Sequence, residues 1–228
     1  KMNDIGLLGF ENETSYALLR SVILSGVSIT YHLINAFYEM KKEGLTFCNY
    51  VQSLVEMGAG IPLRALHNNE KFENDTFKLS FPLLDLQVKS LVKAFEVNTS
   101  VNKLDLRNTS ITDRGGVYIG EILKKNSKLT ILHLKNNNIG DEGCKSIFEG
   151  LRINRTLTRL KLRKNNIGDD GGKSIGEALK VNPTLAELNL QENNFSDDMK
   201  SHLQWVQKCK QEGSNGYSQV TGMRIRTS

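Results

Sequence analysis

A single phrase recurs along this chain at a fixed spacing of 28 residues. Its consensus, L-x-x-L-x-L-x-x-N-x-I, begins at Val101, Leu129, Leu157 and Leu185, with Val and Thr as substitutes in the first copy. Fixed self-similarity of this length is typical of a solenoid, because one repeat cannot bury its apolar face alone and must stack on its neighbours. The repeat therefore predicts the fold before any other feature of the sequence is considered.

Each repeat contains two hydrophobic patterns. Leu132 and Leu134 alternate with polar residues, which predicts a short strand with leucine turned inward. Ile147, Phe148 and Leu151 follow at helical spacing, which predicts a helix whose apolar side faces the sheet. We expect an α/β solenoid with parallel strands on its concave face and helices on its convex face.

Polar residues also recur between the strand and the helix. Asn137 and its equivalents Asn165 and Asn193 occupy one position, where an amide side chain can bond the backbone of a tight bend. Asp141 and Asp169 precede the predicted helices, and we expect them to cap the helices that they open. Both sets are interpreted as structural, so we do not expect these acidic turns to bind a metal.

The ends of the repeat array predict three regions. We assign residues 1–75 to a helical N-terminal cap or module, 76–199 to about five repeats, and 200–228 to a C-terminal capping helix and tail. The N-terminal region is either a cap that shields the first repeat, a separate binding module, or the end of a larger domain. Leu203, Trp205 and Val206 are predicted to form the face of the capping helix. The remaining tail is either a linker or a small added strand.

These repeats resemble the leucine-rich repeats of the ribonuclease-inhibitor subfamily over roughly residues 76 to 207. Similar repeats occur in ribonuclease inhibitor, in the sensor ends of nucleotide-binding innate-immune receptors, in the Ran GTPase-activating protein and in tropomodulin. The resemblance implies an architecture and leaves the partner open, because no motif beyond the repeat consensus matches one of these families.

Motifs for chemistry are absent from the sequence. It has no P-loop, no H-E-x-x-H and no G-x-S-x-G, and its three cysteines form no C-x-x-C pair. We therefore expect a protein that is not an enzyme and has no catalytic, cofactor or metal site. The cysteine usage favours the cytoplasm, and no apolar run approaches the ~20 residues that span a bilayer. Six Asn-x-Ser/Thr sequons are the feature that favours a secreted protein instead.

The concave face carries the main functional signal, because its outward residues align in columns from strand to strand and are mostly basic. Arg107, Lys135 and Arg163 fall in one column, and like charges on neighbouring strands destabilise a sheet. The candidate partner-binding residues are Lys103, Arg107, His133, Lys135, Arg159, Lys161 and Arg163. They are either a binding surface or ordinary solvated charges screened by salt.

We expect the partner to be another protein with an acidic surface. Nucleic acid is disfavoured, because few aromatic residues accompany the basic ones and the net charge is only +5. The sequence therefore predicts a non-catalytic protein-interaction scaffold or recognition module. The alternative is a cytoskeletal or small-GTPase regulator resembling tropomodulin or the Ran GTPase-activating protein. No feature of the sequence sets an oligomeric state.

Overall fold

The computed structural model describes residues 72–79, 82–83 and 85–227. All but the last four residues of the predicted N-terminal region, 1–75, lie outside this range. The division of the chain into three regions therefore stays a prediction.

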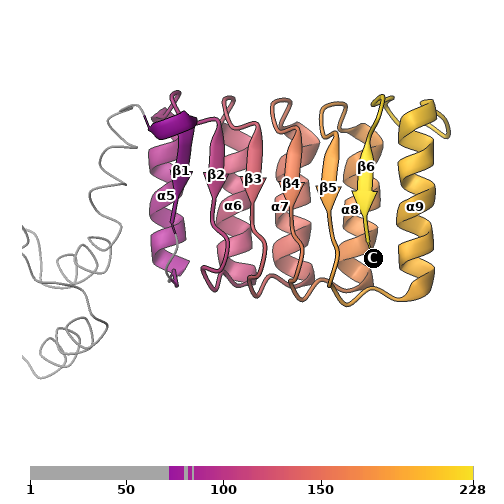
Figure 1. The fold of residues 1–228 in the computed structure, drawn as a ribbon, viewed down its shortest axis with the longest axis horizontal. Coiled ribbons are helices and arrows are strands. Elements are labelled where there is room, and N and C mark those ends of the chain that lie inside the picture. Colours follow the sequence, from indigo (N-terminus) through magenta and orange to yellow (C-terminus); the bar gives the residue numbers. More distant parts are fainter. Residues whose placement is uncertain (1–71, 80–81, 84, 228) are drawn as a thin grey trace, which may run out of the picture. The chain divides into compact units, whose positions relative to one another are not determined.

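Two layers of secondary structure form the solenoid (Figure 1). The described strands form one parallel sheet in sequence order: β1 Thr76–Lys78, β2 Lys103–Asp105, β3 Ile131–His133, β4 Arg159–Lys161, β5 Glu187–Asn189 and β6 Arg224–Arg226. The helices form the second layer: α5 Asp85–Val97, α6 Asp113–Lys125, α7 Asp141–Ile153, α8 Asp169–Val181 and α9 Asp197–Glu212. The predicted α/β solenoid is confirmed.

The register of the sheet follows the repeat. Leu104, Leu132, Leu160 and Leu188 are partners on successive strands and are at most 1 % exposed. Isoleucines of the helices, such as Ile119 and Ile147, are fully buried on the other side of this core. A slip of one residue would turn the leucines outward, so the alternating pattern fixes the register.

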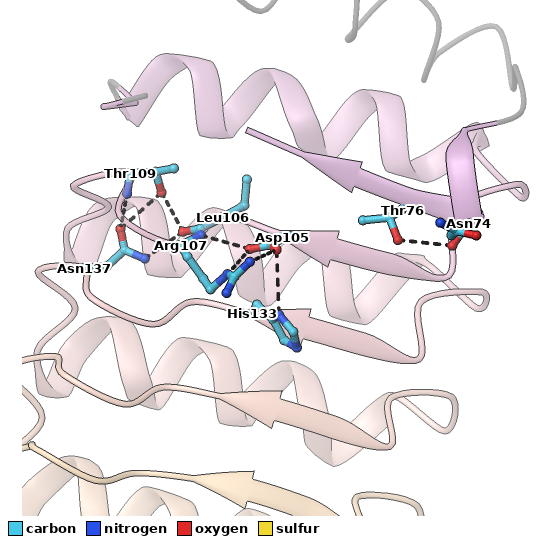
Figure 2. A network of polar contacts seen from close by, with 8 residues as sticks. All are labelled: Asn74, Thr76, Asp105, Leu106, Arg107, Thr109, His133 and Asn137. Carbon is cyan, nitrogen blue, oxygen red and sulfur yellow. Dashed lines mark hydrogen bonds and ion pairs between the residues drawn. The ribbon is translucent and has the colours of Figure 1, made fainter. Parts of the chain in front are cut away.

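A ladder of asparagines joins the bends that follow the strands, and Figure 2 shows one of its members, Asn137, beside Leu106 and Thr109. The Oδ1 atom of Asn137 accepts hydrogen bonds from the backbone N–H groups of Thr109 (3.1 Å) and Ile111 (3.0 Å) in the preceding repeat. Its Nδ2 atom donates to the carbonyls of Leu106 (2.9 Å) and Leu134 (3.0 Å). The Nδ2 atoms of Asn165 and Asn193 donate in the same way, and their Oδ1 atoms accept from the N–H groups of Ile139 and Ile167, each at 3.1 Å. The predicted structural role of these asparagines is confirmed.

A second ladder joins the C-terminal ends of the helices. The Nδ2 atom of Asn126 donates to the carbonyls of Phe95 (2.9 Å) and Asn98 (3.2 Å) in the preceding repeat. Its Oδ1 atom accepts from the N–H groups of its own turn, including that of Leu129 (2.7 Å). Asn154 and Asn182 are bonded in the same way. The sequon at Asn154 thus places its amide in the core of the turn, where it is 5 % exposed.

The aspartates that recur every 28 residues form a third ladder. The prediction that they cap the helices that they open was wrong. The N-cap of α7 is Gly140, and no side chain caps its own helix there. Asp141 instead accepts hydrogen bonds from the N–H groups of Gly168 (2.7 Å) and Gly171 (2.9 Å), at the start of α8. Asp113 and Asp141 therefore each cap the helix of the next repeat, because stacking brings that helix start within reach, whereas α9 is capped by its own Ser196.

The C-terminal helix α9 closes the core with Met199, Leu203 and Val206, while Trp205, predicted to belong to the same face, is 45 % exposed. Lys210 stands 28 residues after Asn182 and is fully buried. Its Nζ atom donates to the carbonyl of Asn182, in place of the amide of a further asparagine. The tail then returns as β6, which settles the choice between a linker and a strand.

We predict that Asn137→Ala destabilises the fold by about 3 kcal/mol, because it leaves several buried backbone groups without partners. Its neighbour Asn138 has an exposed side chain, so Asn138→Ala is the matched control. Urea unfolding followed by circular dichroism measures both variants. Equal midpoints would contradict the role assigned to the ladder.

We predict that Asp141→Ala lowers the free energy of unfolding by about 1–2 kcal/mol, the usual effect of removing a helix cap. The loss should fall on α8, whose first turn Asp141 caps, so amide hydrogen exchange should quicken there more than at the start of α7. Asp170→Ala is the control, since Asp170 is exposed and pairs with Lys173. Faster exchange confined to α7 would contradict this role and would instead support the prediction that Asp141 caps its own helix.

Lys210 should make stability depend on alkaline pH. Burial lowers the pKa of Lys210 from 10.5 to about 8, so between these values the unfolded chain binds the proton and the folded chain does not. The free energy of unfolding should therefore rise with pH in this window, by up to about 3 kcal/mol from this group. Chemical unfolding of the wild type and of Lys210→Met at pH 7.5 and 10 measures the difference, and the rise should be smaller in the variant. The same pH response in both proteins would contradict the assignment.

Candidate functional site

The sheet brings the seven predicted residues together on its concave face. Lys103, Ile131, Arg159, Glu187 and Arg224 are register partners across β2 to β6. Asp105, His133, Lys161, Asn189 and Arg226 form the next column. Arg107, Lys135 and Arg163 follow directly after the strands, where backbone hydrogen bonds join successive repeats.

Arg107 is bound within the chain (Figure 2). Its Nε and Nη2 atoms donate to the two carboxylate oxygens of Asp105, each at 2.8 Å. Asp105 is 2 % exposed, and this burial opposes its ionisation, but the hydrogen bonds and charge of Arg107 outweigh it and lower the pKa of Asp105. Arg107 therefore compensates a buried carboxylate of its own strand.

His133 lies beside this pair and carries no positive charge at neutral pH. Its Nδ1 atom is 3.9 Å from the Asp105 carboxylate, which is too long for a hydrogen bond. Among the described residues, Nδ1 of His133 is the one buried side-chain nitrogen or oxygen atom without a hydrogen-bond partner. Burial and the charge of Lys161 lower the pKa of His133 to about 4, although Asp105 acts in the opposite direction. His133 thus contributes shape and polarity to the face.

The other two arginines also have acidic neighbours. Arg163 forms an ion pair with Glu192, whose pKa is lowered by this hydrogen bond. The Nε atom of Arg159 lies 4.0 Å from a carboxylate oxygen of Glu187. The sequence suggested that Arg107, Lys135 and Arg163 form a column of unpaired like charges. The structure shows instead that both arginines of this column are paired with carboxylates.

The lysines are the remaining cations of the predicted set. Lys103, Lys135 and Lys161 are half-buried, and within the described part of the chain none of them makes an ion pair. A lysine ammonium on a flexible stem can turn toward a partner without breaking an internal contact. Lys103 on β2, Lys161 on β4 and Lys135 just after β3 are therefore the lysines that we consider for partner binding.

The C-terminal tail adds to this surface. Arg224 and Arg226 on β6 extend the two columns beyond β5, and both are exposed. From the sequence these arginines either extend the basic surface or lie in a solvated tail, and the preference for a solvated tail was wrong: β6 pairs with β5 although it begins 37 residues after its partner Glu187, outside the 28-residue register. The alternation in Met-Arg-Ile-Arg was the available signal, since it has the period of a strand.

A row of residues with positive φ forms the rim next to this face. Asn108, Asn136, Lys164 and Glu192 have φ values between 56° and 59°. Asparagine tolerates this left-handed region, whereas Lys164 and Glu192 occupy it at a cost that the surrounding repeats impose. The rim therefore has a fixed backbone, which presents these side chains in a constant position.

None of the described helices has the length and hydrophobicity that crossing a bilayer requires.

The comparisons agree with this architecture. The Leucine Rich repeat family model matches residues 97–120, 125–148, 154–176 and 181–198. A solved structure titled "Leiomodin-1 Actin-Binding Site 2 (ABS2)" is similar at 26 % identity, covering 64 % of this chain and 86 % of that chain, with a TM-score of 0.55. The tropomodulin C-terminal domain of Caenorhabditis elegans is similar in fold at 14 % identity, covering 63 % and 87 %, with a TM-score of 0.52. No curated protein sequence matches the chain. With four matched repeats, a parallel strand in each and the asparagine ladders between them, residues 97–198 form a leucine-rich repeat solenoid.

Proposed function

We propose that this chain is a non-catalytic protein-binding module whose concave face binds the acidic surface of another protein. The proposal rests on one difference between the cations of that face: the arginines lie beside carboxylates of the same chain, and the lysines form no ion pair among the described residues. Arg107, Arg159 and Arg163 each lie within 4.0 Å of a carboxylate, whereas Lys103, Lys135 and Lys161 form no ion pair among the described residues. The lysines are therefore available to carboxylates of a partner.

The fold suits this role because it holds the charges on a fixed backbone. Three side-chain ladders join each repeat to the next, so little conformational entropy is lost when a partner binds. A cluster of one sign also steers an oppositely charged protein and raises its rate of association. Arg224 and Arg226 enlarge the cluster toward the C-terminal end.

Actin is the specific partner that the comparisons favour. The leiomodin-1 domain that resembles this chain is described as an actin-binding site, and the resemblance extends over 64 % of the chain. This supports the cytoskeletal form of the alternative drawn from the sequence. Regulation of a small GTPase stays a prediction from the sequence alone.

We predict that Lys135→Glu combined with Lys161→Glu weakens binding of the full chain to filamentous actin and to a polyglutamate peptide by at least about tenfold. Pelleting with actin and fluorescence anisotropy with labelled polyglutamate provide the two measurements. Affinity of the wild type should fall as salt rises, and this dependence should be weaker in the variant. Lys89→Glu combined with Lys145→Glu changes the net charge equally on the exposed helical layer and serves as the control.

The arginines are poor positions for this test. Arg107→Glu would place a second carboxylate beside buried Asp105 and should destabilise the fold. Equal binding by the two double-lysine variants would overturn the proposal. Binding of polyglutamate without binding of actin would support an acidic partner and reject actin.

A further inference from the structure

His133 is a polar residue of the concave face whose side chain makes no hydrogen bond among the described residues. It is 9 % exposed, and its Nδ1 atom is enclosed without a partner. Enclosing a polar atom in this way costs free energy, and most such atoms in folded proteins are bonded. The repeat does not require histidine here, because the equivalent residues on β4 and β5 are Lys161 and Asn189. The fold of the described chain thus does not account for His133.

The two ring nitrogens of His133 have different surroundings. Figure 2 shows the ring with Nδ1 turned toward the Asp105 carboxylate, 3.9 Å away. Burial opposes the ionisation of Asp105, but the hydrogen bonds and charge of Arg107 outweigh it and lower the pKa of Asp105, so this carboxylate is ionised at neutral pH. Nε2 has no hydrogen bond either, but it is not enclosed as Nδ1 is, so a partner can reach it.

This arrangement decides which nitrogen carries the proton of the neutral ring. A lone pair on Nδ1 would face the negative charge of Asp105, so the proton belongs on Nδ1. Nε2 is then an acceptor in the free protein. It can donate a hydrogen bond to an anion only after the ring has taken up a second proton.

Charged side chains of both polarities flank His133. On the β2 side they are Lys103, Asp105 and Arg107, on the β4 side they are Arg159, Lys161 and Arg163, and Lys135 follows on the chain of His133 itself. The acidic groups beside this set are Asp105, Glu187 and Glu192, and each of them lies beside an arginine. Lys103 and Lys161 form no ion pair among the described residues, so they are the cations beside His133 that an anion of a partner can pair with.

These lysines also help to keep His133 neutral in the free protein. Burial lowers the pKa of His133 to about 4, and Lys161, Lys103 and Arg107 add to this effect, while Asp105 opposes it. An oxyanion that pairs with Lys103 and Lys161 compensates two of these cations and brings a negative charge to Nε2. The ring can then hold two protons, with Nδ1–H directed at Asp105 and Nε2–H at the oxyanion.

We infer that His133, Lys103 and Lys161 form a site for one oxyanion group of the partner, a carboxylate or a phosphate, and that His133 takes up a proton when this site is filled. The inference rests on the proposed function, because the site lies in the concave face. The complex holds one proton more than its free components between pH 4 and the raised pKa of bound His133. Affinity should therefore increase as the pH falls through that raised value.

A labelled hexapeptide of cysteic acid tests the pH dependence, since its sulfonates stay ionised at every pH used. By fluorescence anisotropy, the full chain should bind it at least about threefold more tightly at pH 5.5 than at pH 7.5. His133→Gln keeps a polar side chain without a titrating group, so its affinity should be the same at both pH values. His202→Gln is the matched control, because His202 is exposed on α9, and it should keep the pH dependence of the wild type. Unchanged pH dependence in His133→Gln would overturn the inference.

NMR of the imidazole rings in the wild type keeps the test independent of how well the variants fold. The ring signals of His133 should titrate at higher pH in the complex than in the free chain, and those of His202 should not move. If His133 stays neutral at pH 5.5 in the complex, the inference fails while the concave-face proposal stands.

Two further peptides identify the source of the oxyanion. Hexapeptides of glutamate and of phosphoserine are compared at pH 6.0, where both carry negative charge. The group that fits the site is the one whose binding weakens at least about threefold in His133→Gln. Equal binding of both peptides by His133→Gln and the wild type would overturn the inference alone. Absence of binding by every peptide would reject the concave-face proposal together with it.

Discussion

The structure depends on hydrogen bonds from side chains of one repeat to the backbone of the next. Short strands and tight bends leave many peptide groups buried, and each must be bonded or the fold loses free energy. Asn137 binds the bend before its own, Asn126 binds the preceding helix end, and Asp141 binds the following helix start. No repeat can satisfy its own backbone, so stability is a property of neighbouring pairs and the array behaves as a one-dimensional chain of coupled units.

Much of this fold could be predicted from the sequence because the period assigns each residue a position. The inward leucines, the strands and the asparagine bends all follow from alternation and spacing. The partner of Asp141 could not be predicted, because a perfect repeat looks the same whether a side chain acts within its unit or on the next. Trp205 and β6 were harder for another reason, since both lie where the repeat ends and its consensus no longer applies.

The candidate site stays a prediction, and the ion pairs within it are what the sequence did not indicate. Periodicity placed the basic residues on one face, yet it treated arginine and lysine as equivalent. Asp105 and Arg107 are two residues apart, so they lie on the same side of the chain, and their pairing was within reach of the strand pattern. The burial of Asp105 was not, because it depends on packing against neighbouring strands. On this face the arginines lie beside carboxylates of the same chain, and the lysines form no ion pair among the described residues.

The asparagine ladder at the helix ends has a chemical direction, and within the described chain it ends at Lys210. An asparagine in this ladder donates to carbonyls of the preceding repeat and accepts from N–H groups of its own turn. Its oxygen thereby holds the turn that leads into the next strand. A lysine side chain can only donate, so it completes the unit behind it and offers nothing to the turn ahead. The chain after Lys210 no longer follows the 28-residue spacing, and it reaches the sheet as β6 after a longer connection. Adding a further unit by duplication would therefore require an amide in place of this lysine to continue the ladder.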